Sequence, residues 1–265
     1  MTLFQPVVPQ GGLVGYLFLK RTMENQTAFF NKSPDLKLDT DYFKENIASV
    51  ETVDDLMGDY RLLKVALGAF GLEADIGNRF FIRQILEQGT KDDTALANKM
   101  SDDRYKRMSE AFGFDNFTSP NTQNAGFAAE IVDLFNRQQF EVAVGEQDTS
   151  LRLALNAEHA LINVAEEDSS ERVKWFSIMG NPPLREVMET ALGLPSSFGQ
   201  MDIDKQVEVF ADRARSQLGL ESLSDLADDE VRADVIQRFL LMDQVRSFNS
   251  GMSSGSIALT LLRGG

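Results

Sequence analysis

The stretch VALGAFGLEADI, residues 65–76, ends a helical pattern of apolar residues on Gly71, which stands between two large apolar residues. The same short phrase returns as AFGF at 111–114, as ALGL at 191–194 and as QLGL at 217–220. A glycine just past a helix adopts the left-handed conformation without a Cβ clash, and the apolar residue after it folds back onto the last turn. The phrase therefore predicts helix C-terminal caps at Gly71, Gly113, Gly193 and Gly219.

A catalytic glycine-rich loop is the alternative interpretation of this phrase. Such a loop needs a preceding strand and a spacing such as G-x-G-x-x-G or G-x-x-x-x-G-K-[ST]. Neither spacing accompanies the phrase in this chain. Helix termination is therefore the favoured interpretation.

Apolar residues recur at helical spacing along most of the chain. This spacing predicts helices over 13–31, 41–49, 52–70, 76–88, 92–100, 102–112, 168–179, 183–192, 202–218 and 228–247, with a short helical turn at 223–226. The pattern from 127 to about 166 weakens at Gly145, which is compatible with one kinked helix or with two helices. No alternation typical of a strand lasts beyond four residues, so the expected fold is an all-α multi-helix bundle.

The expected organisation has four parts. Residues 1–12 form an N-terminal arm, 13–115 and 126–246 form two helical subdomains around a polar linker, and 247–265 form a C-terminal tail. The segments LLKVALGAFGLEADIG, 62–77, and LREVMETALGLPSSFG, 184–199, align without a gap. The alignment fits either a duplication that produced two related halves or convergence of two helix–cap–helix hairpins. Both explanations stay open.

The composition excludes several kinds of site and disfavours some partners. The chain has 265 residues with 26 Lys and Arg against 41 Asp and Glu, a net charge of −15. This charge disfavours nucleic acid and anionic membranes as partners, because phosphates repel an acidic surface. There is no cysteine, which excludes disulfides, thiol nucleophiles and zinc–thiolate sites. The apolar stretch 13–19 is too short to span a bilayer and lacks the flanks of a signal peptide, so we expect neither.

The residues that could carry chemistry have ordinary structural interpretations. His159 is the only histidine and lacks partners at metal-site spacing. Trp175 fits a core position, and the default for Arg61, Arg79, Arg83 and Arg104 is ion pairing within the chain. Carboxylates occur together at 54–55, 92–93, 102–103, 166–168 and 228–229. Most of these stand where a helix begins, and there they complement the helix dipole. We therefore assign no catalytic, cofactor-binding or metal-ligating residue, and we expect no tightly bound transition metal.

Four short phrases in the first half of the chain are DYRLL at 59–63, AFGL at 69–72, LAN at 96–98 and AFGF at 111–114. With them the chain resembles an uncharacterised all-helical family of α-proteobacteria. The resemblance is strongest over about 13–118, and IDKQVEVFADRA at 203–214 fits a second half. Members are often encoded near flagellar genes, and no activity is established for them. The resemblance implies a helical fold, a cytoplasmic or flagellum-associated place and no catalytic residue that could be carried over.

Two functions follow as hypotheses. The first is a non-enzymatic helical interaction protein with a protein partner, accessory to flagellar assembly or structure. The second is a small-ligand binder or an enzyme with a carboxylate and arginine site between helices. For the first, the apolar end IALTLL after a Ser/Gly-rich linker is the expected docking tail, with Ile257, Leu259, Leu261 and Leu262 contacting an apolar surface of the same or another chain.

Overall fold

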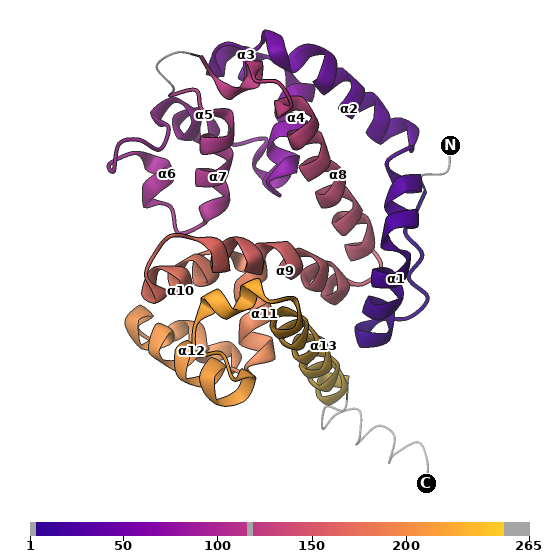
Figure 1. Cartoon of the computed structure of the whole chain (residues 1–265), viewed down its shortest axis with the longest axis vertical. Coiled ribbons are helices and arrows are strands. Elements are labelled where there is room, and N and C mark those ends of the chain that lie inside the picture. The colour runs from indigo at the N-terminus through magenta and orange to yellow at the C-terminus, as the bar shows by residue number, and fades with distance from the viewer. Residues whose placement is uncertain (1–3, 116–118, 252–265) are drawn as a thin grey trace, which may run out of the picture. The chain divides into compact units, whose positions relative to one another are not determined.

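The computed structural model describes residues 4–115 and 119–251, and these residues contain only helices and connecting loops (Figure 1). The all-α prediction is confirmed. The α-helices are α1 (Gly12–Phe30), α2 (Pro34–Asn46), α3 (Val53–Gly58), α4 (Tyr60–Ala69), α5 (Arg79–Gln88), α6 (Leu96–Lys99), α7 (Asp103–Phe112), α8 (Phe127–Gly145), α9 (Thr149–Glu166), α10 (Glu171–Gly180), α11 (Pro182–Ala191), α12 (Ile203–Leu218) and α13 (Asp229–Gly251). Short 3-10 helices join several of them, among them η4 (Ser196–Gln200) and η5 (Leu223–Ala227).

The chain divides into two compact units. Unit 1 consists of 20–147 with the segments 4–7 and 179–181, and unit 2 consists of 148–178 and 182–251 with the segment 8–19. This division differs from the expected subdomains 13–115 and 126–246. Helix α8 lies in unit 1 because it packs on α4 and α2, so the loop before it does not separate the units.

Several elements differ from the periodicity-based ranges for local reasons. The stretch 52–70 is two helices because Asp59 ends α3 and accepts from the backbone N–H groups of Arg61 at 2.9 Å and Leu62 at 3.1 Å, which begins α4. The stretch 127–166 is two helices, one of the two expected alternatives, since Asp148 accepts from Leu151 N–H at 3.0 Å and starts α9. Helix α2 starts earlier than expected, at Pro34, because proline fits a first helical turn.

The four predicted glycines all lie in the left-handed region just past a helix. Their φ angles are 70° at Gly71, 59° at Gly113, 61° at Gly193 and 68° at Gly219. At Gly71 the N–H of Leu72 donates to Leu67 O at 2.9 Å and the glycine N–H donates to Gly68 O at 3.1 Å. These are the two hydrogen bonds of a Schellman ending. Gly193 has the same pair, whereas Gly113 and Gly219 bond to the carbonyl four residues before them.

Arginine side chains reinforce two of these helix ends. In unit 1, Arg104 donates to Gly71 O at 2.8 Å while its guanidinium pairs with Asp102. In unit 2, Arg246 donates to the carbonyls of Glu189 and Leu194 on either side of Gly193. The carbonyls at a helix end have no partner within the helix, so a cation there supplies the missing donors.

Gly68, inside the opening stretch, has a packing role that its sequence context did not reveal. A Cβ built on Gly68 would lie 2.6 and 2.7 Å from two ring atoms of Phe135 on α8. Phe135 is buried, so its ring has little room to move. The absence of a side chain at this position is what lets α4 and α8 approach each other in the core of unit 1.

Replacing Gly68 with alanine should lower the free energy of unfolding by about 1–2 kcal/mol. Overpacking a core costs about 1–3 kcal/mol, and the better helix propensity of alanine returns at most about 1 kcal/mol. Gly58→Ala is the matched control, because a Cβ at Gly58 meets nothing within 4 Å. Urea unfolding of both variants followed by circular dichroism checks the expectation, and equal midpoints for the two would refute the packing role.

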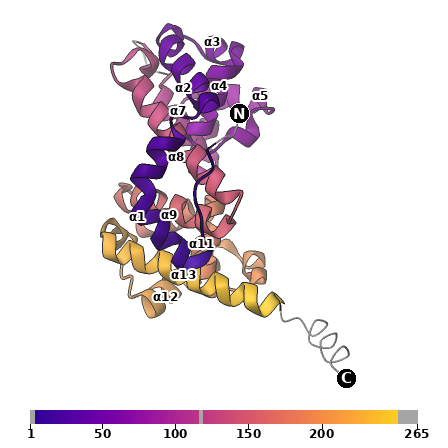
Figure 2. The ribbon, with the colours of Figure 1, turned by 90° about the vertical axis from the view of Figure 1, so that its right-hand side faces the viewer.

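Unit 2 has an aromatic centre. Trp175 of α10 stacks on Phe210 of α12 with ring centroids 5.4 Å apart. Phe198 of η4 meets the Phe210 ring edge-on, with centroids 5.0 Å apart. Trp175 is only 4% exposed, which makes it the core anchor that the sequence indicated. Helices α9 and α11 pack against α13 on the other side of this unit, as Figures 1 and 2 show.

Candidate functional site

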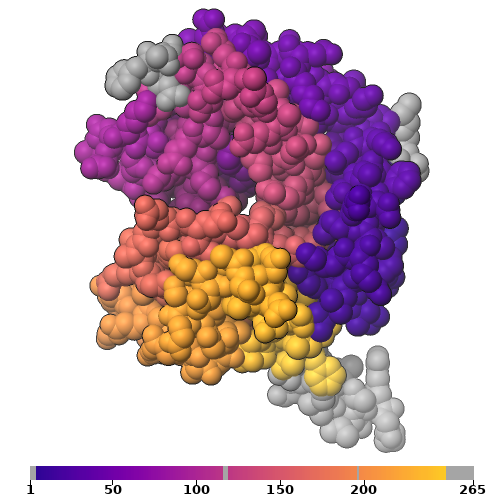
Figure 3. Space-filling view, in the orientation of Figure 1, coloured from indigo at the N-terminus to yellow at the C-terminus, as the bar shows by residue number. Residues whose placement is uncertain are grey.

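The last turns of α13 carry an apolar surface that faces away from unit 2. Val235, Ile236, Phe239 and Leu240 are buried, whereas no residue from 241 to 248 is. Figure 2 shows these turns reaching beyond the helices that surround the first half of α13, and Figure 3 shows them at the surface in yellow. Helix α13 runs to Gly251, so 247–251, expected in the tail, are helical.

Three large apolar side chains line one side of these turns. Leu241 is 49% exposed, Val245 is 51% exposed and Phe248 is 68% exposed. Their spacing of four and three residues places them on one face of a helix. We call these three residues the outer face of α13.

Two polar side chains of the same turns point the other way, toward the other helices of unit 2. Asp243 accepts from the Ser150 hydroxyl at 2.6 Å, and Arg246 donates to the Thr190 hydroxyl at 2.7 Å. For these residues the usual arrangement of a surface helix, apolar side inward and polar side outward, is reversed. Exposed apolar faces are typical of association sites, which makes the outer face of α13 a candidate site.

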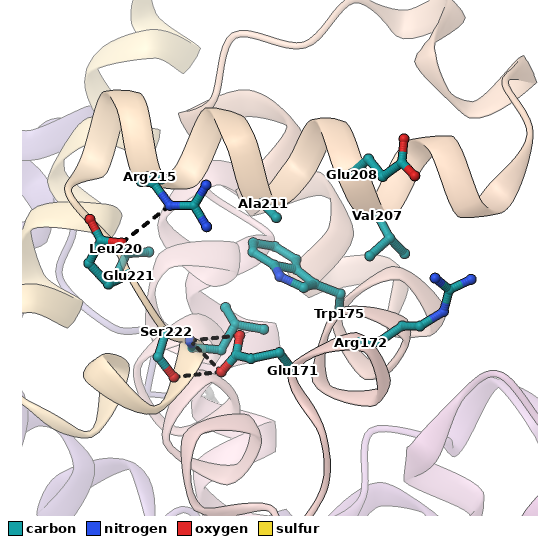
Figure 4. Close-up of a pocket in the computed structure, with 11 residues that line it drawn as sticks. Glu171, Arg172, Trp175, Val207, Glu208, Ala211, Arg215, Leu220, Glu221 and Ser222 are labelled. Atoms are coloured by element: carbon teal, nitrogen blue, oxygen red, sulfur yellow. Dashed lines mark hydrogen bonds and ion pairs between the residues drawn. The ribbon is translucent and has the colours of Figure 1, made fainter.

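A groove between α10 and α12 is the second candidate site (Figure 4). It is open on one side and has a volume of about 250 Å³. Its lining residues are Glu171, Arg172, Trp175, Val207, Glu208, Ala211, Arg215, Leu220, Glu221, Ser222 and Leu223. The groove thus brings together the carboxylates and arginines that an inter-helical site would need.

Most of these charged groups already have partners in the chain. Glu171 accepts from Leu223 N–H at 3.1 Å and from the Ser222 hydroxyl, which fixes the start of η5. The Arg215 guanidinium pairs with Glu221 (Figure 4), and its Nε lies 3.2 Å from Oε2 of the carboxylate. Arg172 pairs with Asp204 at the start of α12. The groove is therefore a place where side chains hold unit 2 together rather than a set of groups converging on an open centre.

Three of the paired carboxylates act as helix caps in the structure, whereas Asp92 and Asp93 stand before a loop, because α6 begins only at Leu96. Asp55 completes a capping box with Thr52, whose hydroxyl and backbone N–H hold the pKa of Asp55 below its ordinary value. Asp102 accepts from Arg104 N–H at 3.1 Å, and Asp228 accepts from Glu230 N–H at 2.8 Å. The cap interpretation is confirmed at these three positions.

The remaining sequence candidates do not gather into a site. His159 is half-buried on α9, and Arg83 pairs with Asp54 and Glu87. Over 4–115 and 119–251, no group of three or more His, Cys, Asp or Glu side chains is placed to hold a metal ion. None of the helices in these ranges combines the length and the apolar character needed to cross a bilayer.

Periodicity placed Leu241 and Val245 in a helix that ended at about Ser247 and left Phe248 in the tail, so the outer face of α13 was missed. The available signal was a second apolar stripe, shifted around the helix from Val235, Ile236, Phe239 and Leu240. When one helix carries two apolar stripes, only one of them can face the core of its own unit, so the other is expected at the surface.

Comparisons with known proteins agree with a helical family without assigned activity. A family model described as "Protein of unknown function (DUF1217)" matches residues 69–231. The crystal structure of protein AGR_C_984 from Agrobacterium tumefaciens is similar, with 26% identity, a TM-score of 0.76 and coverage of 91% of this chain and 99% of that one. A search of curated proteins finds no match. The predicted resemblance to an uncharacterised family is confirmed.

Proposed function

The chain belongs to the DUF1217 family of proteins of unknown function, and we propose that it is a non-enzymatic helical protein that binds another protein through the outer face of α13. The observation that carries this proposal is the reversed polarity of the last turns of α13. Leu241, Val245 and Phe248 stay about half exposed or more while Asp243 and Arg246 are directed toward unit 2.

Burying the outer face would release useful binding energy. Covering the exposed part of each of the three side chains is worth about 1 kcal/mol, so the face supplies about 3 kcal/mol in total. That amount is too small for a stable complex by itself, because association costs at least about 4 kcal/mol in lost freedom of motion. The partner we infer is therefore an apolar or amphipathic segment that also contacts residues around the face.

We propose that this partner belongs to flagellar assembly or structure, and the support for this is the resemblance to a family whose members are often encoded near flagellar genes. Under this proposal the protein is cytoplasmic or associated with the flagellum. The acidic net charge of −15 supports a protein partner over a nucleic acid.

Binding of a small ligand between α10 and α12 is the alternative function. The volume of the groove, about 250 Å³, favours it. Against it stand the internal pairs of Glu171, Arg172 and Arg215, which a ligand would have to break.

A photo-crosslinking residue placed at position 245 in the native cell tests the proposal. We expect a defined crosslinked partner that is absent when the same residue is placed at the exposed Lys205 on α12. Leu241→Asp should abolish the crosslink and leave stability within about 0.5 kcal/mol, because substitutions at exposed positions cost little. The same crosslinked proteins from both positions, or a crosslink at 245 that persists in Leu241→Asp, would contradict the proposal.

A further inference from the structure

We propose that the segment IALTLL, residues 257–262, covers the outer face of α13 in its own molecule until a partner displaces it. The inference rests on the proposed function, since it names what occupies the same face when no partner is bound. The segment, with its predicted docking residues Ile257, Leu259, Leu261 and Leu262, lies outside the described residues.

The chain after α13 is long enough to return along the outer face. From Gly251 to Leu241 the helix spans about 15 Å at 1.5 Å per residue. The six residue steps from Gly251 to Ile257 reach at most about 20 Å. The connecting residues GMSSGS, 251–256, contain two glycines and three serines, a composition that allows the chain to reverse.

The chemistry of the segment matches the outer face. Ile257, Leu259 and Leu261 alternate, so an extended segment places all three on one side. They would cover Leu241, Val245 and Phe248, which lie on one side of α13.

Charge favours the same path. Arg263 follows the apolar segment directly, and an extended segment running back along α13 carries it toward Asp234 and Glu230. Both carboxylate residues are exposed. They lie on the same side of α13 as the outer face, because they precede Leu241 by seven and eleven residues, about two and three helical turns.

A second copy of the chain is a weaker occupant of this face. A stable dimer needs about 800 Å² of buried surface on each partner, far more than three partly exposed side chains supply. A segment joined to the face by five residues acts at an effective concentration of the order of millimolar. It loses little translational and rotational entropy on binding, because it is already attached to the same molecule. The small area therefore fits an internal occupant.

Hydrogen exchange of the backbone amides of residues 241–248 in the full chain tests the inference. We expect exchange there to speed up about tenfold when the segment is disabled by Leu259→Asp with Leu261→Asp, which is the factor for a segment whose dissociation constant lies about tenfold below its millimolar effective concentration. The matched control places the same two charges in the connecting residues, as Ser253→Asp with Ser254→Asp, and should leave exchange unchanged. Sedimentation of the wild-type chain should show a monomer.

Two outcomes would overturn the inference. Equal exchange in the wild type and in the Leu259→Asp, Leu261→Asp variant means that the segment does not cover the face. Protection that grows with protein concentration, together with a dimer in sedimentation that the same variant loses, means that the segment binds a second copy instead. A photo-crosslinker at 245 separates this inference from the proposed function, because a crosslink to 252–265 of the same chain reports the internal occupant and a crosslink to another protein reports the partner.

Discussion

Replacing Gly71 with valine should lower the free energy of unfolding of unit 1 by about 2–4 kcal/mol. The left-handed conformation costs a residue with a Cβ about 1–2 kcal/mol, and it costs a β-branched residue more. The φ angle of 70° at Gly71 is set by the Schellman hydrogen bonds of the α4 end. A Cβ there would also lie 3.3 Å from Gln138 Oε1 and 3.5 Å from Arg104 Nη1, which donates to Gly71 O.

Urea unfolding followed by circular dichroism measures this effect, because Trp175, the single tryptophan, lies in unit 2 and does not report on unit 1. Gly71→Asn is the informative companion, since asparagine tolerates the left-handed region better and should recover part of the loss. Gly58→Val controls for the change of residue type at a position without a positive φ. An unchanged midpoint for Gly71→Val combined with a lost biological activity would revive the functional-loop interpretation.

Replacing Phe210 with alanine should destabilise unit 2 by about 3–5 kcal/mol, the usual cost of removing a fully buried phenylalanine. Phe210 is fully buried, stacks on Trp175 and meets Phe198 edge-on. Its loss leaves a cavity in the core of unit 2, and α12 would lose the ring contact with Trp175 of α10.

The fluorescence of Trp175 during urea unfolding reports this change directly, because the indole stacks on the residue that is removed. Phe210→Leu fills most of the space and should cost less than half as much. Glu208→Ala, on the exposed rim of the same groove, should stay within about 0.5 kcal/mol of the wild type. Similar losses for Glu208→Ala and Phe210→Ala would show that the groove rather than the aromatic centre holds α12 in place.

The sequence by itself determined the class of fold and the places where several helices begin and end. Gly71, Gly113, Gly193 and Gly219 all stand at helix ends with positive φ, and Asp55, Asp102 and Asp228 cap helix starts. These features are readable because each depends on hydrogen bonds among residues at most six positions apart. Helical periodicity likewise follows from neighbours along the chain.

Only the tertiary structure decided which helices belong together. The polar loop before α8 looked like a boundary, yet α8 joins unit 1 because Phe135 packs on Gly68, far away in sequence. No local pattern records such a contact, since a small residue in one helix and a ring in another are each compatible with many partners.

The tertiary structure also decided which apolar stripe of α13 became a surface. Phe239 and Leu240 meet the rest of unit 2, whereas Leu241, Val245 and Phe248 do not, although both sets are equally apolar in the sequence. The reason is geometric: a helix has one side toward its core, and the contacts of Asp243 with Ser150 and of Arg246 with Thr190 turn the second stripe away from it.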